Sequence, residues 1–134
     1  QDYEDRLREA FQVPNPEVPR FDLVLLGLGN DGHTASLFPG SDALAETVRL
    51  AVATPGPLHP RITLTLPVFN RARQVFFLVT GDAKQAVLRE LLQAPGPVAA
   101  LPASLVRPDR GRVTWFVATG PSGSVPPHPA PGPR

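Results

Sequence analysis

The residues best suited to acid–base chemistry are Asp31 and His33, two positions apart in the segment GNDGHTASLFPG. A histidine can accept a proton near neutral pH, and a nearby carboxylate can orient its imidazole and stabilise the charged form. The pair follows the apolar run 21–28, which is typical of a buried strand in a parallel sheet. Since open α/β sheets hold ligands beyond the carboxyl ends of their strands, the pattern predicts an active site here. A loop Asp and His that only satisfy backbone groups are the alternative.

The glycines of segment 27–32 have the G-x-G-x-x-G spacing of a dinucleotide-binding turn. Such a turn should open a long helix, with an acidic residue at the end of the next strand about 20 positions on. Here Pro39 stops any helix early, and Asp42 and Glu46 come too soon and lie outside a strand. The sequence therefore argues against a nucleotide cofactor.

A second junction of strand, glycine and helix is predicted at Thr80-Gly81-Asp82-Ala83-Lys84. A helix N-terminus presents free N–H groups and positive partial charge, which suit a phosphate, and Lys84 adds a point charge. Lys84 is also the only lysine in the chain. An ordinary turn with a solvated lysine is the alternative. Arg61 opens a predicted strand and is either an anion ligand at the same sheet edge or a surface arginine.

Composition narrows the class of protein. The 134 residues suit one domain, and a net charge of +1 gives no reason to expect nucleic acid or a membrane surface as partner. The chain has no cysteine, no apolar run of membrane-spanning length and no visible signal peptide, so we expect an intracellular, cytoplasmic protein. The spacing of His33, His59 and His128 does not predict a metal site.

Apolar periodicity and turn residues predict alternating strands and helices, and therefore an α/β fold with a mostly parallel sheet flanked by helices. The expected strands are 21–28, 48–53, 61–66, 74–80 and 112–117, and the expected helical segments are 1–12, 34–38, 42–46, 67–73, 82–93 and 102–106. Residues 118–134 are rich in Pro, Gly and Ser and are expected to form a disordered tail.

The segment FDLVLLGLGNDGHTASLFPG closely resembles the signature of the 6-phosphogluconolactonases. Three further segments agree in order: RITLTLPVFNRAR, VFFLVTGDAKQAVLREL and LPASLVRPDRGRVTWFV. The resemblance covers residues 1 to about 117 and implies a Rossmann-like α/β fold. It also implies hydrolysis of 6-phospho-D-glucono-1,5-lactone to 6-phosphogluconate in the oxidative pentose phosphate pathway, without a metal or an organic cofactor.

The resemblance also implies roles for single residues. His33 corresponds to the general base that activates water, with Asp31 as its neighbour in the site. Six residues are expected to bind the substrate or its phosphate: Lys84, Gly81, Arg61, Gly29, Asn30 and Gly32. Among them Lys84, beside Gly81, corresponds to a phosphate-contacting lysine, and Arg61 is a weaker candidate. Our own inference from the loop chemistry is that backbone N–H groups of residues 29–32 stabilise the tetrahedral oxyanion.

The related glucosamine-6-phosphate isomerases/deaminases share the fold and a D-G-H segment. In those enzymes the segment continues toward a catalytic Glu, whereas this chain has Phe38 at the corresponding position. This difference favours the lactonase. The competing interpretations are an isomerase-like enzyme and a non-catalytic piece that binds sugar phosphates.

The resemblance is to the C-terminal half, or somewhat more, of the family's domain. A glycine- and serine-rich phosphate loop and an Asp-Glu-Arg segment normally lie upstream and are not found here. After the last predicted strand, Ala118-Thr119-Gly120 stand where the family usually has Asp and an alanine-rich helix. We therefore expect residues 1–117 to be the C-terminal portion of a single lactonase domain. The missing N-terminal portion is then a candidate partner, and the incomplete sheet should expose edges and core surface.

Overall fold

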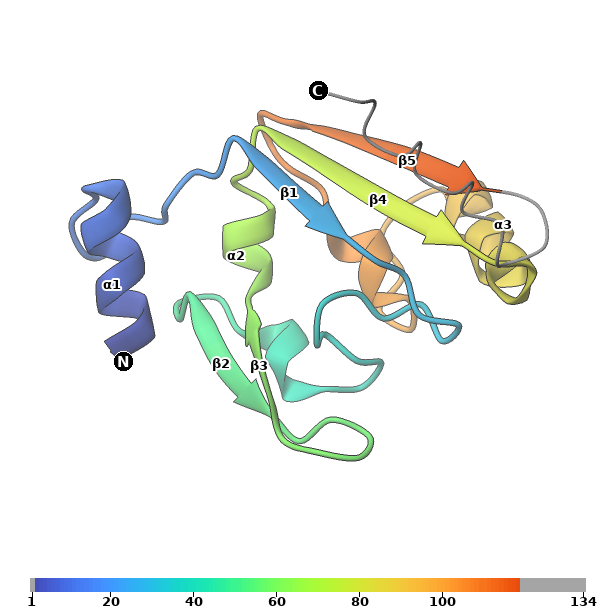
Figure 1. Cartoon of the computed structure of the whole chain (residues 1–134), viewed down its shortest axis with the longest axis horizontal. Coiled ribbons are helices and arrows are strands. Elements are labelled where there is room, and N and C mark those ends of the chain that lie inside the picture. Colours follow the sequence, from blue (N-terminus) through green and yellow to red (C-terminus); the bar gives the residue numbers. More distant parts are fainter. Residues whose placement is uncertain (1, 119–134) are drawn as a thin grey trace, which may run out of the picture.

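A computed structural model describes residues 2–118 of the chain (Figure 1). The helices and strands, in chain order, are α1 (Asp2–Phe11), β1 (Leu23–Leu26), η1 (Asp42–Ala45), β2 (Ala51–Thr54), β3 (Arg61–Leu64), α2 (Leu66–Phe69), β4 (Gln74–Thr80), η2 (Asp82–Lys84), α3 (Gln85–Gln93), η3 (Pro102–Leu105) and β5 (Arg112–Ala118). Elements labelled η are single 3₁₀ turns. The tail predicted from residue 118 lies outside the described residues, apart from Ala118 at the end of β5.

The main sheet is parallel and has the strand order β1-β4-β5. Leu26, the last residue of β1, pairs with Phe77, and β4 continues for another three residues to Thr80. The continuous apolar run of β4 suits its central position in this parallel sheet. The predicted α/β fold with a largely parallel sheet flanked by helices is therefore confirmed.

One local prediction is wrong, and another is confirmed with a pairing that the sequence did not specify. Segment 34–38 is not a helical turn, because Ala35 has a φ of +50° and Thr34 and Leu37 form an isolated bridge around it. The strands expected at 48–53 and 61–66 do form, as β2 and β3, but they pair antiparallel in a sheet of their own. Arg61, the first residue of β3, thus lies away from the edge of the main sheet.

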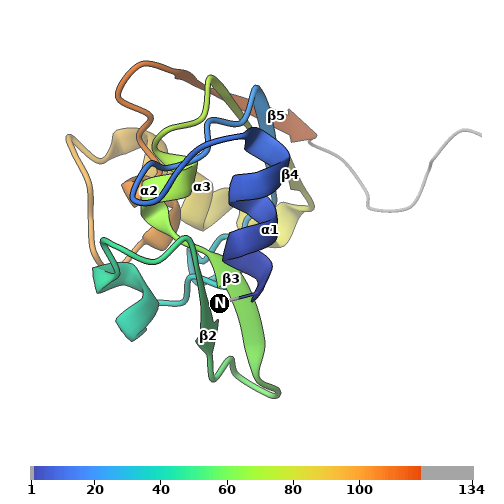
Figure 2. The same ribbon diagram turned by 90° about the vertical axis from the view of Figure 1, so that its left-hand side faces the viewer.

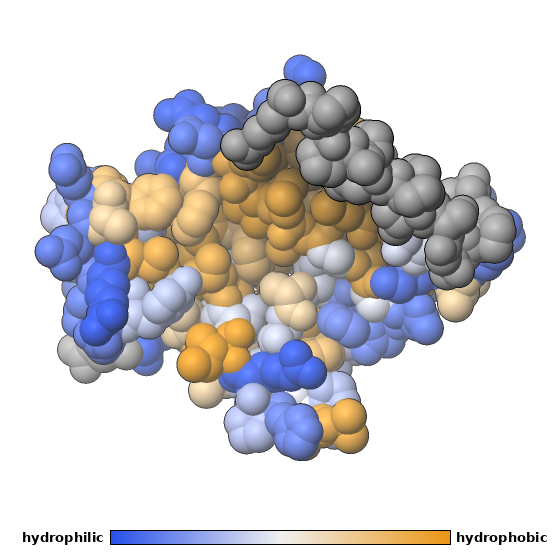
Figure 3. Space-filling model, in the orientation of Figure 1, coloured by the Kyte–Doolittle hydropathy of each residue, from blue (hydrophilic) through white to orange (hydrophobic). Residues whose placement is uncertain are grey.

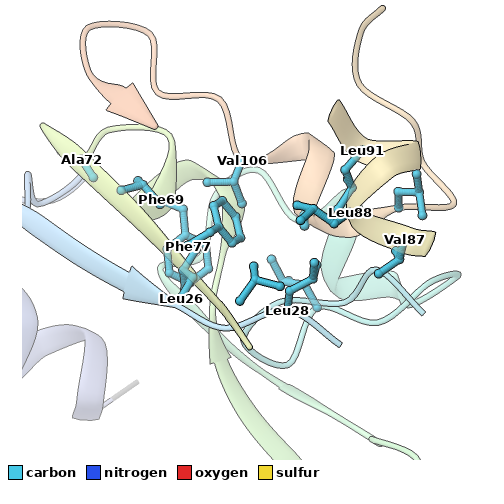
Figure 4. Packing of buried hydrophobic residues seen from close by; sticks show 14 of the residues in the cluster. Leu26, Leu28, Phe69, Ala72, Phe77, Val87, Leu88, Leu91 and Val106 are labelled. Carbon is cyan, nitrogen blue, oxygen red and sulfur yellow. The ribbon is translucent and has the colours of Figure 1, made fainter. Parts of the chain in front are cut away.

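One face of the main sheet packs against helices and holds the core (Figure 4). Alternate residues of the strands point to this face, as period-2 geometry requires. Phe77 of β4 is completely buried there and stacks on Trp115 of β5 at a ring-centroid distance of 4.1 Å. The core also contains Leu26 and Leu28, Val87, Leu88 and Leu91 of α3, and Leu101, Ala103 and Val106 in and beside η3.

The opposite face of the main sheet carries apolar side chains that no helix covers. We call this surface the open face; it consists of Leu23, Leu25, Phe76, Leu78 and Phe116. Figure 3, in the orientation of Figure 1, shows hydrophobic surface where the sheet lies.

Helix α1 lies beside the small sheet, not over the open face (Figure 2). Its Glu4 carboxylate accepts hydrogen bonds from the N–H groups of Leu50 and Ala51, at 2.7 and 3.1 Å, and from Arg49 Nε. These bonds lower the pKa of Glu4 although partial burial acts to raise it. Within residues 2–118, no helix combines the length and apolar character that crossing a bilayer requires.

Candidate active site

The imidazole of His33 and the carboxylate of Asp31 are in direct contact. The distance from His33 Nδ1 to Asp31 Oδ1 is 2.5 Å, and the backbone N–H of His33 also donates to Oδ1 at 3.0 Å. The side chains are 34% and 51% exposed, so both remain accessible to solvent. A carboxylate at Nδ1 selects the neutral tautomer with its proton on that nitrogen, which leaves Nε2 as a proton acceptor.

The segment 27–37 holds this pair through its own backbone. Gly29 N–H donates to the His33 carbonyl at 2.9 Å, and Gly32 N–H donates to the Gly29 carbonyl at 3.0 Å. The Thr34 side chain is buried, and its hydroxyl donates to the Gly27 carbonyl at 2.8 Å. Ala103 of η3 donates to the Gly32 carbonyl at 2.9 Å and ties the loop to the helical layer. These bonds fix the backbone on both sides of the catalytic candidates.

Gly29 occupies a position where any side chain would collide with the pair. A Cβ built on Gly29 would lie 2.1 Å from His33 Nδ1 and 2.8 Å from Asp31 Oδ1. The absence of a side chain at this position is therefore what lets the imidazole and the carboxylate meet. Gly32 differs, because its φ of +85° is itself a conformation that favours glycine.

The environment keeps Asp31 ionised. Partial desolvation acts to raise the pKa of Asp31, but the hydrogen bonds from the backbone N–H and the ring of His33 outweigh it and lower the pKa below its ordinary value of 3.8. A carboxylate that is ionised at neutral pH stabilises, at Nδ1, an imidazolium that forms at His33. The pair is therefore arranged for general-base chemistry.

An open cleft of about 540 Å³ adjoins the pair and is lined by Asp31, by residues 38–41 and by residues 54–57. Phe38 stands in its wall, and the Phe38 ring lies 4.8 Å from the His33 ring. The side chain beside His33 at this position is thus aromatic, not a carboxylate. Among the described residues, Asp31 is the one ionisable side chain in the lining of this cleft, whose other residues are mostly Phe, Pro and Gly.

Arg61 lies near this cleft because β2 and β3 form an antiparallel hairpin, which the sequence did not predict. The hairpin of β2 and β3 brings it back beside Gly56, where a Cβ would lie 2.9 Å from Arg61 Cγ. Gly56 lines the cleft and Arg61 is exposed. Arg61 thus stands beside the cleft, although not at the main sheet edge where it was expected.

The second predicted junction follows the strand next to β1. Gly81 comes after β4 with a φ of +96°, and the one-turn η2 ends at Lys84 before α3 begins. Because β1 and β4 are parallel neighbours, both junctions leave the same edge of the sheet. Leu28, just after β1, shares a core cluster with Val87 and Leu88 of α3 (Figure 4). The half-buried Lys84 itself makes no ion pair among residues 2–118.

Fewer backbone N–H groups are free to stabilise an oxyanion than the sequence predicts. The N–H groups of Gly29 and Gly32 already donate within the loop. Of the four N–H groups of residues 29–32, those of Asn30 and Asp31 donate no hydrogen bond to another residue within the described part of the chain. Asn30 and Asp31 are therefore the remaining candidate donors to an oxyanion.

Sequence reasoning missed two contributors to the site. In the sequence, Phe38 is informative only because it stands where the related isomerases have a carboxylate. In the structure its ring packs on the ring of His33. Residues 54–57 also line the cleft. Their sequence, T-P-G-P, indicates a turn but does not show where in the fold that turn lies. Between residues 2 and 118, no cluster of three or more His, Cys, Asp or Glu side chains could hold a metal ion.

The main sheet is parallel, and the His–Asp pair and the cleft lie beyond the carboxyl end of one of its strands. These features define an α/β protein with a ligand site at its strand ends. The family model of glucosamine-6-phosphate isomerases/6-phosphogluconolactonase matches residues 1–115. The chain belongs to this family.

Two relatives and one solved structure similar to this chain carry the same name, 6-phosphogluconolactonase. The chain is 46% identical over 120 residues to a 6-phosphogluconolactonase of Rattus norvegicus, covering 87% of this chain and 45% of that protein. It is 44% identical over 117 residues to a 6-phosphogluconolactonase of Synechocystis, covering 87% and 48%. The crystal structure of 6-phosphogluconolactonase from Leishmania guyanensis superposes with a TM-score of 0.72 at 36% identity, covering 87% and 48%. The chain thus spans about half the length of the relatives it matches.

Proposed function

We propose that this chain carries the acid–base part of a 6-phosphogluconolactonase site and takes part in hydrolysing 6-phospho-D-glucono-1,5-lactone to 6-phosphogluconate. The observation that carries the proposal is the 2.5 Å contact between His33 Nδ1 and Asp31 Oδ1 beside an open cleft. The names of the relatives support the choice of substrate.

In the proposed reaction, His33 Nε2 takes a proton from water as the water oxygen attacks the lactone carbonyl carbon. The carbonyl oxygen becomes an oxyanion, for which the Asn30 and Asp31 N–H groups are the proposed donors. The tetrahedral intermediate then collapses, the bond from the carbonyl carbon to the ring oxygen breaks, and the imidazolium returns its proton to that oxygen. Asp31 stays ionised and stabilises the charged ring. General-base activation of this kind needs no metal or organic cofactor.

The phosphate of the substrate is assigned to the second junction. Lys84 supplies a positive charge, and the backbone at Gly81 and the N-terminus of α3 supply positive partial charge. Arg61 is the weaker candidate for an anion contact, from its place beside the cleft. We expect further phosphate ligands from the part of the domain that the relatives have outside the match, and no nucleic acid as partner. A cytoplasmic location stays a prediction.

The direct test follows lactone hydrolysis by proton release with the full chain, alone and mixed with the part of the rat relative that lies outside the match. His33→Ala is expected to lower the rate at least about 100-fold, the size of a general-base contribution. His59→Ala is the matched control, because His59 is an exposed histidine of the loop before β3. Equal rates for wild type and His33→Ala, above the spontaneous background, would remove the general-base role.

The alternatives give different results. An isomerase-like enzyme would release ammonia from glucosamine 6-phosphate, but at position 38 an aromatic ring, not a carboxylate, packs against His33. A non-catalytic piece would bind 6-phosphogluconate in a calorimetric titration yet show no hydrolysis in either arrangement. Hydrolysis without ammonia release is the outcome that the lactonase proposal predicts.

A further inference from the structure

We propose that the amino-terminal end of the main sheet carries a second binding site, which takes a phosphate group and lies opposite the end that holds Asp31 and His33. The site is a pocket of about 340 Å³ whose lining includes Arg20, Arg71 and Arg110. A volume of this size suits a small ligand. The proposal does not depend on the reaction proposed above, because it uses none of the same residues.

Three segments of the chain meet at this end of the sheet because the strands are parallel. Arg20 lies three residues before β1, Arg71 lies three residues before β4, and Arg110 lies two residues before β5. Figure 1 shows the three strands starting at the same end of the sheet. Parallel pairing therefore brings three arginines that are far apart in the sequence to one pocket.

Positive charge is concentrated at this end of the sheet. Six of the twelve arginines of the chain lie in the segments before the three strands, at residues 20–22, 71–73 and 107–112. The same segments contain two carboxylates, and one of them, Asp22, pairs with Arg73 at 3.1 Å. Among the described residues, the lining of the pocket itself has three guanidinium groups and one carboxylate, an excess of two positive charges. A phosphate monoester, with a charge of about −1.5 to −2 at neutral pH, balances that excess.

Arg20 makes the pocket suitable for an anion. Its Nε donates to the Arg71 carbonyl at 3.2 Å, and its Nη2 donates to the Arg110 carbonyl at 2.9 Å. Carbonyl oxygens carry negative partial charge and repel anions, but the guanidinium of Arg20 occupies these two. A guanidinium has five N–H groups, so Arg20 keeps further donors for a ligand. Because Arg20 bonds to the backbone of both neighbouring segments, it also fixes their separation.

The side chains of Arg71 and Arg110 are the remaining cationic ligands. Both are exposed, and neither makes an ion pair in the described part of the chain. A guanidinium presents parallel N–H donors that match two oxygens of one phosphate. The backbone beneath them is held by Asn70, whose Oδ1 accepts from the Arg107 N–H at 2.6 Å and whose carbonyl accepts from the Asp109 N–H at 3.2 Å. The two side chains thus extend from a fixed backbone.

Asp109, the carboxylate in the lining, gives the pocket a preference among anions. An ionised carboxylate accepts hydrogen bonds and donates none. It suits an anion that carries an O–H group, such as hydrogen phosphate or a phosphate monoester with hydroxyl groups. Sulfate has no O–H group at neutral pH, so its oxygens would face the Asp109 carboxylate without a hydrogen bond. We therefore expect phosphate to bind more tightly than sulfate.

The test titrates the full chain with inorganic phosphate, glycerol phosphate and sulfate, followed by calorimetry and by amide shifts in NMR spectra. Phosphate in at least one of its two forms is expected to shift amides of residues 20–22, 70–73 and 107–112 and to bind at least about tenfold more tightly than sulfate. Binding of inorganic phosphate alone would support a site for the free ion. Tighter binding of glycerol phosphate would support a site for phosphorylated small molecules.

Matched variants localise the site. Arg71→Ala and Arg110→Ala are each expected to weaken phosphate binding about tenfold, because each removes one charged ligand. Asp109→Asn should abolish the preference over sulfate. Arg89→Ala is the control, because Arg89 is an exposed arginine on α3. Lys84→Ala should leave the shifts at the amino-terminal end unchanged, which separates this site from the second junction. Circular dichroism verifies that each variant folds.

Each outcome supports or overturns the proposal. Phosphate that shifts only amides around Gly81 would overturn it, and so would Arg71→Ala and Arg110→Ala variants that bind phosphate as tightly as wild type. Binding that disappears at physiological ionic strength would also overturn it, since it would reflect only screened surface charge. A chain that binds phosphate here but hydrolyses no lactone would support this proposal and contradict only the proposed function.

Discussion

Two junctions leave the same edge of the parallel sheet, and they are built in opposite ways. After β1, the loop bearing Asp31 and His33 is closed by its own hydrogen bonds and tied to η3. After β4, the junction at Gly81 has only the bonds of a single turn, from Lys84 N–H to the Gly81 carbonyl at 3.3 Å and from Gln85 N–H to the Asp82 carbonyl, and α3 has no side-chain cap. The first junction is fixed internally, and the second leaves its donors open.

The difference matches the two kinds of work proposed for the junctions. Proton transfer needs donor and acceptor at a defined separation, so the imidazole and carboxylate must be in place before substrate arrives. Binding a phosphate needs positive charge and free donors, which a flexible lysine and a helix N-terminus supply with less demand on geometry. Changes in the first junction should therefore cost more than changes in the second.

The largest effect is expected from Gly29→Ala. The added methyl collides with the ends of the His33 and Asp31 side chains, which can move, so the chain should fold while the pair separates. Misplacement of about 1 Å costs about 100-fold in rate, and a loss of at least that size is expected in the proton-release assay. Gly27→Ala is the matched control in the same loop, because a Cβ there meets nothing within 4 Å. A fully active Gly29→Ala would show that the contact is not required.

Gly32→Ala should act on folding instead. Gly32 has a φ of +85°, and a Cβ there would lie 2.8 Å from Leu101 Cδ2 and 3.3 Å from Leu101 Cα. Left-handed strain and overpacking together are expected to destabilise the chain by about 1–3 kcal/mol in denaturant unfolding. Gly40→Ala separates the two causes, since Gly40 has a φ of +74° but open space around it. Equal losses for both variants would mean that contact with Leu101 contributes nothing.

Lys84→Ala should have a smaller effect and should act on binding alone. Removing one charge–phosphate contact is expected to weaken 6-phosphogluconate binding about tenfold, or about 1.4 kcal/mol, in a calorimetric titration. Gluconate, which lacks the phosphate, should bind wild type and variant alike. Arg89→Ala is the control, because Arg89 is an exposed cation on α3, the helix that follows Lys84. If Lys84→Ala weakens the binding of both ligands equally, Lys84 does not contact the phosphate.

The sequence predicted the strand ends better than the loops between them. Residues 74–80 form β4 with the expected bounds, because a continuous apolar run closed by Gly81 leaves little choice. The meeting of both junctions at one edge follows from parallel pairing and was also predictable. The antiparallel pairing of β2 with β3 was not, since strand periodicity records which face is buried and not which strand is the partner.

The candidate site shows the same limit at finer scale. The types and spacing of Asp31 and His33 identify the chemistry, but their 2.5 Å contact depends on Gly29 having no side chain. The helical turn predicted at 34–38 failed because the loop holds Ala35 in a left-handed conformation. The first fact is a steric fit and the second a loop conformation, and both depend on contacts between residues several positions apart that a local pattern does not display.

The smallest effect expected is that of Asp31→Asn on stability, and it is a test of what holds the first junction together. Folding lowers the pKa of Asp31 below 3.8, so the ionised carboxylate stabilises the folded chain above that pH, and the contribution fades as the pH falls through the lowered value. The side chain is 51% exposed, and solvent screening limits the contribution to below about 1 kcal/mol.

Denaturant unfolding of wild type and Asp31→Asn should thus differ slightly at pH 7 and converge below about pH 3.8. A small difference would assign the rigidity of this junction to its backbone hydrogen bonds, with the carboxylate free to serve the imidazole. A loss of several kcal/mol at pH 7 would instead make the charge pair the element that holds the loop closed. In that case the first junction would resemble the second, in that a single charged side chain would dominate its properties.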